Sequence, residues 1–182
     1  NQIKEFGYDF VNIGGIHVEP MAIYSKKYTS IEEIPEGGTI IMSNSVAEQG
    51  RVLSLLEASG LIKLDPAVNK SEATLDNIVE NPKNLVIDAE PSPEILVSFY
   101  ENEEGDAVVI NSNFAIDAGI SPVDDSIAIE GGASDYVNVI ATTKEKENDP
   151  ALKRLVEVLQ SEEISDFILE EWDGAVVPVG NK

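Results

Sequence analysis

The chain has 182 residues, enough for one large domain or two small ones, and 42% of them are hydrophobic, which supports a folded core. Its 34 acidic and 12 basic residues give a formal net charge of −22. This balance argues against nucleic-acid binding, because phosphate neutralisation needs clustered lysine and arginine, and against direct adsorption to an anionic membrane surface. The absence of cysteine excludes disulfides and thiol catalysis. We find no apolar segment long enough to span a membrane.

Strand-like and helix-like segments alternate along the chain, which is typical of an α/β fold. The predicted strands, in chain order, are 10–13, 21–24, 39–42, 84–87, 107–110 and 136–142. Gly14-Gly15 is expected to interrupt the extended structure between the first two strands. The predicted helices cover 45–59, begin again at Ser92-Pro93 and at Asp149-Pro150, and finish with 162–172.

The helix after Asp149 has the clearest pattern in the sequence. Asp149 is expected to be its N-cap, and Pro150 suits the first helical position. Its apolar residues fall on one face at helical spacing, and they are Leu152, Leu155, Val156 and Leu159. We therefore expect Leu155 to be buried.

The strand 107–110 ends in Asn111-Ser112-Asn113, so a buried strand delivers two side-chain amides to its carboxyl end. Asparagine favours turns, which is the structural interpretation. The functional interpretation is recognition, because ligands of open α/β sheets bind outside the carboxyl ends of the strands.

The strand 39–42 leads into the stretch SNSVAEQGR and then a helix. Ser45 and Glu48 form a capping-box pattern. The free amides and positive dipole at such a helix start favour an anionic group. Arg51 either supplies a positive charge to a ligand there or pairs with Glu48 on the helix surface. Farther along, Asn138 interrupts an apolar strand beside Tyr136, as a ligand contact or as a hydrogen-bonded strand residue.

Catalytic patterns are weak. His17 is the only histidine, and no nucleophile–base pattern accompanies it. The sequence shows no metal-ligand spacing and no phosphate-binding glycine pattern, so we expect no metal and no cofactor. A hydrolase that uses two carboxylates such as Glu48 and Asp106 is a minor alternative. We expect a protein that is not an enzyme.

Several segments together resemble the methionine-binding lipoprotein family (NlpA/MetQ-like), which are solute receptors of ABC importers. The segments are IHVEPMAIYSKKYTSIEEIPEGGTIIMSNSVAEQGRVLSLLEASGLIKL, DNIVENPKNL, DAVVINSNFAIDAGISPVDDSIAIE, DYVNVIATT and WDGAVVPV. Order and spacing hold over almost the whole chain. The family pattern begins earlier, with a lipid-bearing cysteine and first strands that would precede Asn1, and the chain lacks an initiator Met, so we expect a processed, truncated or partial N-terminus.

The resemblance implies a periplasmic-binding-protein-like architecture with two α/β lobes and a ligand cleft between them. The chain would form lobe one, cross to lobe two, and return. Residues 1–26 and 131–182 would be an incomplete lobe one, and residues 27–130 would be lobe two.

The resemblance also implies site residues. The last asparagine of the Asn-x-Asn motif holds the amino acid's polar head in the family, and Asn113 matches it. Asn138 matches the asparagine of a Tyr-x-Asn motif, with Tyr136 beside it. An amide both donates and accepts hydrogen bonds, so it suits an ammonium and a carboxylate. Three residues complete the predicted ligand contacts because they follow the strand 39–42, and these are Asn44, Glu48 and Arg51.

Two departures from the family pattern concern the ligand. Glu48 stands where the family commonly has asparagine. The segment 92–98 holds no arginine, whereas the family uses one there to clamp the ligand carboxylate. The ligand implied is therefore methionine-like, another amino acid, a short peptide or a solute that is not zwitterionic.

The function implied is an extracytoplasmic receptor that delivers this small ligand to the permease of an ABC importer. Its only membrane attachment would be a lipid anchor outside this chain. The alternative is a non-transporting surface lipoprotein of the same fold that acts in protein interaction or adhesion.

Overall fold

The computed structural model describes residue 3, residues 6–131 and residues 136–179. The chain divides into two compact units, one made of residues 1–20 and 131–182 and the other of residues 21–130. Residues 21–26 thus group with the second unit, because strand β2 (Ala22–Tyr24) pairs with strands of that unit. The compact units divide after Pro20 and after Glu130, and the expected lobes with their bounds stay a prediction.

The second unit contains a five-stranded sheet with the order β6-β3-β7-β2-β8. The strands are β2, β3 (Thr39–Ile41), β6 (Val86–Asp88), β7 (Ala107–Ile110) and β8 (Ser126–Ile129). Strand β3 runs parallel to β6 and β7, whereas β2 runs antiparallel to β7 and β8. The carboxyl ends of β3 and β7 therefore lie at the same edge of the sheet.

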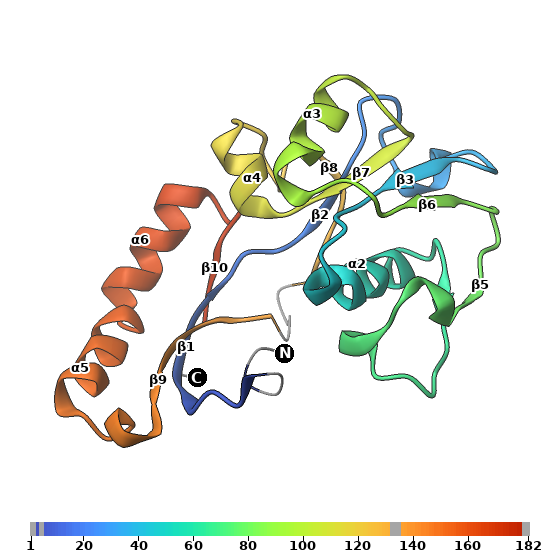
Figure 1. Ribbon diagram of the computed structural model, residues 1–182. Helices are drawn as coiled ribbons and strands as arrows, with labels where there is room; N and C mark the ends of the chain where they lie inside the picture. Colours follow the sequence, from blue (N-terminus) through green and yellow to red (C-terminus); the bar gives the residue numbers. More distant parts are fainter. Residues whose placement is uncertain (1–2, 4–5, 132–135, 180–182) are drawn as a thin grey trace. The chain divides into compact units, whose positions relative to one another are not determined.

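Helices cover both faces of this sheet (Figure 1). They are α2 (Val46–Ala58), α3 (Leu96–Glu101) and α4 (Ser112–Asp117), and Figure 1 shows α3 and α4 on the face opposite α2. A two-stranded ribbon, β4 (Lys63–Leu64) and β5 (Ile78–Glu80), lies in the same unit, with short 3-10 helices at Ile31–Glu33, Lys70–Glu72, Leu75–Asn77 and Pro93–Ile95.

Two hydrophobic cores result from the alternation of side chains along the central strands. In β7, Ala107 and Val109 join the core that contains the apolar face of α2, whereas Val108 and Ile110 join the core beneath α3 and α4. All four residues are fully or almost fully buried. A strand that is buried on both faces requires a continuous apolar run, and the sequence AVVI provides one.

The first unit contains an antiparallel sheet with the order β10-β1-β9. Its strands are β1 (Phe10–Val18), β9 (Asn138–Thr143) and β10 (Val177–Pro178), and its helices are α5 (Pro150–Leu159) and α6 (Glu162–Trp172). A 3-10 helix at Lys144–Lys146 joins β9 to the segment before α5. The N-cap prediction is confirmed, since the Asp149 side chain accepts a hydrogen bond from the Ala151 amide.

The prediction that Gly14-Gly15 interrupts the strand is wrong, because β1 continues through both glycines with small register irregularities. The glycines serve close packing instead. A Cβ atom on Gly14 would lie 2.4 Å from Cγ1 of Val156 in α5. Helix and strand can approach this closely only because the strand has no side chain at that position.

The expected burial of Leu155 is also wrong. Leu155 is 43% exposed, whereas its neighbour Val156 is 8% exposed. The contact with Gly14 orients α5 so that Val156 faces β1, which turns Leu155 toward solvent. Leu152 and Leu159, the other members of the predicted stripe, are half-buried.

Gly50 provides a test of how α2 is packed. A Cβ atom there would lie 2.5 Å from the Lys70 carbonyl oxygen and 2.7 Å from the carbonyl carbon of Ser71. Helix propensity alone predicts that Gly50→Ala stabilises the protein by about 1 kcal/mol. We expect the opposite, a loss of about 1–3 kcal/mol, because backbone cannot move aside as a flexible side chain can.

Urea unfolding followed by circular dichroism measures this change in stability. Gly131→Ala is the matched control, since a Cβ atom there meets no atom within 4 Å. A Gly50→Ala variant as stable as the wild type would contradict the packing described here.

Candidate functional site

The candidate site lies at the edge of the second unit's sheet where β3 and β7 end. Strand β3 leads through Ser43 and Asn44 into α2, and β7 leads through Asn111 into α4. Both connections are only a few residues long, so each helix begins close to the end of its strand. This placement agrees with the expectation that polar side chains gather at the carboxyl ends of parallel strands.

Glu48 and Asn111 are joined at this edge. The Asn111 side-chain nitrogen Nδ2 donates a hydrogen bond of 2.6 Å to Oε1 of Glu48. The other carboxylate oxygen, Oε2 of Glu48, is buried and has no hydrogen-bond partner in the described part of the chain. The predicted capping box is therefore wrong, since Glu48 turns to Asn111 and the Ser45 side chain makes no cap bond.

The two asparagines predicted as ligand contacts in this unit are both exposed. Asn113 lies in the first turn of α4, two residues after Asn111. Asn44 donates through Nδ2 to the Glu90 carbonyl oxygen at 3.0 Å, so it ties the end of β3 to the segment after β6. Their part in ligand binding stays a prediction.

Arg51 has a partner that the sequence did not indicate. Its Nη2 lies 2.6 Å from Oε2 of Glu130, and its Nε donates to both carboxylate oxygens at 3.2 and 3.1 Å. The expected surface pair with Glu48 is wrong. The two side chains are only 12% and 15% exposed, so this is a largely buried ion pair.

Glu130 also joins the two strands at the boundary of the unit. Its Oε2 accepts a 3.1 Å hydrogen bond from the Met21 amide, and its own amide donates to the Met21 carbonyl oxygen at 2.8 Å. Met21 precedes β2 and Glu130 follows β8. Arg51 therefore connects α2 to the first and last residues of the second unit.

In the first unit, Asn138 begins β9 opposite His17 of β1. The Asn138 Nδ2 atom lies 3.2 Å from Nε2 of His17 and donates a hydrogen bond of 3.3 Å to Oε1 of Glu19. Nε2 of His17 and Oε1 of Glu19 are 2.9 Å apart. Tyr136, two residues before β9, is half-buried. Sequence reasoning considered His17 by itself, and the available sign of a polar cluster was Glu19, which follows two residues later, just after the end of β1.

The carboxylate-pair hydrolase does not fit the geometry. Asp106 precedes β7, where its Oδ2 accepts from the Thr39 amide at 2.7 Å and its Oδ1 accepts from the Tyr28 hydroxyl at 3.2 Å. Glu48 lies at the other end of the same strands. The four residues of β7 separate these ends by about 13 Å, too far for two carboxylates to act on one bond. In the residues that the structure describes, no group of acidic, histidine or cysteine side chains is arranged to hold a metal ion.

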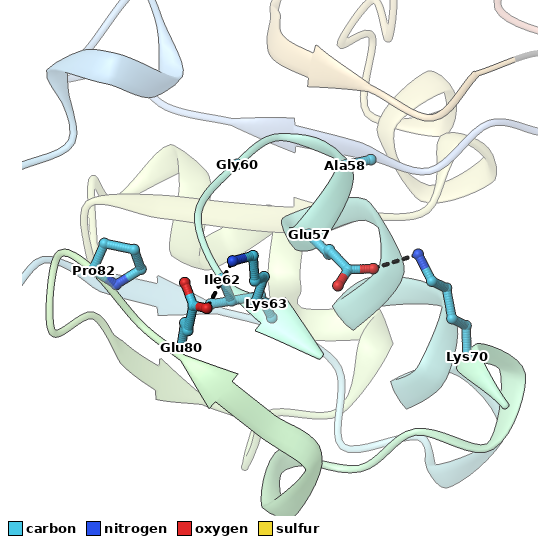
Figure 2. A pocket seen from close by; sticks show the side chains of 8 residues that line it. All are labelled: Glu57, Ala58, Gly60, Ile62, Lys63, Lys70, Glu80 and Pro82. Carbon is cyan, nitrogen blue, oxygen red and sulfur yellow. Dashed lines mark hydrogen bonds and ion pairs between the residues drawn. The ribbon is translucent and has the colours of Figure 1, made fainter. Parts of the chain in front are cut away.

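A separate open pocket of about 550 Å³ lies at the far end of α2, around the β4–β5 ribbon (Figure 2). Its charged side chains pair with one another. Lys63 is 2.7 Å from Glu80, and Lys70 contacts Glu57. Each lysine in the lining is therefore already paired with a glutamate, so neither lysine offers an unpaired positive charge. None of the predicted ligand contacts lines it.

The comparisons with known proteins identify the family. A model of the NlpA lipoprotein family matches residues 1–180. The chain belongs to the NlpA lipoprotein family. It is 49% identical over 173 residues to the methionine-binding lipoprotein MetQ of Bacillus subtilis (strain 168), and the alignment covers 94% of this chain. The chain spans 63% of the length of that relative.

Two solved structures show the same fold. One is a nutrient binding protein from Burkholderia cenocepacia bound to methionine, with a TM-score of 0.87 and 35% identity over 97% of this chain and 73% of the other. The second is a periplasmic substrate-binding protein of an ABC transporter from Coxiella burnetii, also with a TM-score of 0.87 and 35% identity, over 98% of this chain and 73% of the other. The expected α/β fold of periplasmic-binding-protein type is thereby confirmed. The names of these relatives are those of binding proteins, in agreement with the expectation of a non-enzyme.

In the described residues, every helix is too short or too polar to cross a membrane.

The buried pair of Arg51 and Glu130 generates a stability prediction. Arg51→Gln leaves the Glu130 carboxylate buried without its guanidinium, so we expect a loss of about 3–5 kcal/mol in the free energy of unfolding. The midpoint of urea unfolding measures it. Arg154→Gln is the matched control, because Arg154 and its partner Glu157 are 73% and 65% exposed. That pair should contribute less than about 1 kcal/mol. Equal losses in the two variants would show that Arg51 has no special structural role.

Glu57 generates a pH prediction. The Lys70 ammonium group and the Leu64 amide, which donates to Oε1 at 2.8 Å, hold the pKa of Glu57 below its usual value of 4.5. The unfolded chain therefore takes up this proton first as the pH falls. The stability that Glu57 contributes is complete above about pH 5 and is lost as the pH falls through the folded-state pKa.

We expect the wild type to lose stability more steeply than Glu57→Gln between about pH 5 and pH 3. Glu104→Gln, which removes an exposed carboxylate of the same unit, should follow the wild-type curve. Parallel curves for wild type and Glu57→Gln would contradict the assignment.

Proposed function

We propose that this chain acts as an extracytoplasmic solute-binding receptor that delivers an amino acid of the methionine type, or a short peptide, to an ABC importer. The geometric observation that carries the proposal is the shared edge of β3 and β7. There the chain collects Asn44, Glu48, Asn111 and Asn113 at the carboxyl ends of two parallel strands. Membership of the NlpA lipoprotein family and similarity to a methionine-bound protein support an amino-acid ligand.

The importer partner and the location belong to the same proposal. The relative from Coxiella burnetii is named as a substrate-binding protein of an ABC transporter, and the relative from Bacillus subtilis is named as a lipoprotein. We infer a permease partner for this chain and attachment to the cell membrane through a lipid anchor outside the residues present here. Asn113, Asn138 and Tyr136 are the proposed contacts to the polar head of the ligand, and Asn44 and Glu48, which follow β3, are further proposed contacts. Arg51 acts indirectly, because its guanidinium holds Glu130.

A solute screen tests the receptor function. Thermal denaturation of the protein is measured in the presence of each proteinogenic amino acid and of methionine-containing dipeptides. A ligand that binds only the folded state raises the melting temperature. We expect an increase for at least one amino acid or dipeptide. A melting temperature that no solute changes would overturn the proposal.

Asn113 should contribute to affinity rather than to folding, because its side chain is exposed. With the solute found in the screen, we expect Asn113→Ala to weaken binding by about 1–3 kcal/mol through the polar group that it leaves unpaired. Isothermal titration calorimetry measures the affinity, and urea unfolding shows whether stability is unchanged. Asn102→Ala, at an exposed asparagine after α3, is the matched control. Unchanged affinity in Asn113→Ala would leave Asn113 with a turn role only.

A further inference from the structure

Glu48 has an oxygen atom that the described chain does not satisfy. Oε2 is buried, yet it accepts no hydrogen bond, whereas Oε1 of the same carboxylate accepts from Asn111 at 2.6 Å. A buried acceptor without a donor costs the hydration free energy of that atom, and the cost is larger for a charged group. Such atoms are rare in folded proteins, and a donor for this oxygen must be a group other than the described residues, such as a ligand or water.

The neighbouring cation does not supply this donor. Arg51 lies one helical turn after Glu48, where an ion pair would form readily. Its guanidinium instead holds both carboxylate oxygens of Glu130. Glu48 forms no ion pair with a lysine or arginine in the described residues. At the edge of the sheet where the ligand is proposed to bind, Glu48 thus has no cationic side chain of the described residues as a partner, and the hydrogen bond that it accepts comes from Asn111.

The hydrogen bond to Asn111 adds a second acceptor to this edge. A carboxylate only accepts, so the Asn111 amide must point its nitrogen toward Glu48. The carbonyl oxygen Oδ1 of Asn111 is then left to accept from another group. With an asparagine at position 48, the Asn111 amide could adopt either orientation. The carboxylate of Glu48 therefore fixes two acceptors, its own Oε2 and Oδ1 of Asn111.

Two acceptors and one negative charge are complementary to a group that is positive and carries several donors. A metal ion is disfavoured because the described residues provide no group of three metal-binding side chains. A protonated amine provides three donors and one positive charge. We propose that Glu48 binds the protonated amino group of the transported solute, with Asn111 held by Glu48 as an additional acceptor. This inference rests on the proposed receptor function and names the chemical group that the site selects.

Four probes separate the amine from the rest of the ligand, and each is titrated calorimetrically into the wild-type chain. Methionine carries both charged groups, N-acetylmethionine lacks the ammonium, 4-(methylthio)butanoate lacks the amine altogether, and 3-(methylthio)propylamine lacks the carboxylate. We expect methionine to bind at least tenfold more tightly than N-acetylmethionine and 4-(methylthio)butanoate, and we expect 3-(methylthio)propylamine, which keeps only the amine, to bind measurably. Equal affinity for methionine and N-acetylmethionine would overturn the inference while leaving the receptor function intact.

The variant Glu48→Gln keeps the shape of the side chain and removes its charge. We expect it to bind methionine at least tenfold more weakly than the wild type and to bind 4-(methylthio)butanoate with unchanged affinity. Glu101→Gln, which removes an exposed carboxylate from α3, is the matched control for net charge and should bind all probes as the wild type does.

The outcomes distinguish the two proposals. Wild-type affinity for methionine in Glu48→Gln overturns the role of Glu48 alone. If no amino acid, dipeptide or probe binds the wild type, both the receptor function and the role of Glu48 are overturned. Should Glu48→Gln fail to fold, the four-probe comparison on the wild type still decides whether the site selects a protonated amine, because it requires no variant.

Discussion

The buried ion pair between Arg51 and Glu130 is the constraint on which the second unit depends. It connects α2 with the strand that opens the unit and the strand that closes it, through the hydrogen bond that Glu130 accepts from the Met21 amide. A charge pair that is mostly removed from water is stable only with close geometry and further hydrogen bonds, and this pair has both. This arrangement holds α2 in place. It thereby also positions the first turn of α2 near the carboxyl end of β7.

The same pair decides the chemistry at the sheet edge. Arg51 would neutralise Glu48 if it were free, because the two residues face each other on one helix. Since Arg51 is held by Glu130, Glu48 forms no ion pair with it and accepts a hydrogen bond from Asn111 instead. A structural interaction thus leaves a carboxylate available for a ligand. In a chain with a net charge of −22, most carboxylates are solvated, and the buried oxygen of Glu48 stands apart from them.

Packing around glycine sets the finer geometry of both units. Gly50 allows α2 to lie against the backbone of residues 70 and 71, and Gly14 allows α5 to lie against β1. At each glycine, the neighbouring atoms lie closer than a Cβ atom would permit: the backbone of residues 70 and 71 at Gly50, and the Val156 side chain at Gly14. The two hydrophobic cores of the second unit then form on either face of a central sheet whose strands alternate between them.

The sequence by itself determined the α/β class, the strand 107–110, the helix 162–172 and the N-cap at Asp149, because each depends on a local pattern of apolar or capping residues. It also indicated that polar residues collect after β3 and β7. Only the tertiary structure decided the partners, since Arg51 and Glu130 are 79 residues apart in sequence and Glu48 and Asn111 are 63 apart. Local periodicity likewise could not show that β1 passes through Gly14 or that Val156 rather than Leu155 faces it. Those outcomes depend on which distant element packs against the residue, and a one-dimensional pattern does not contain that information.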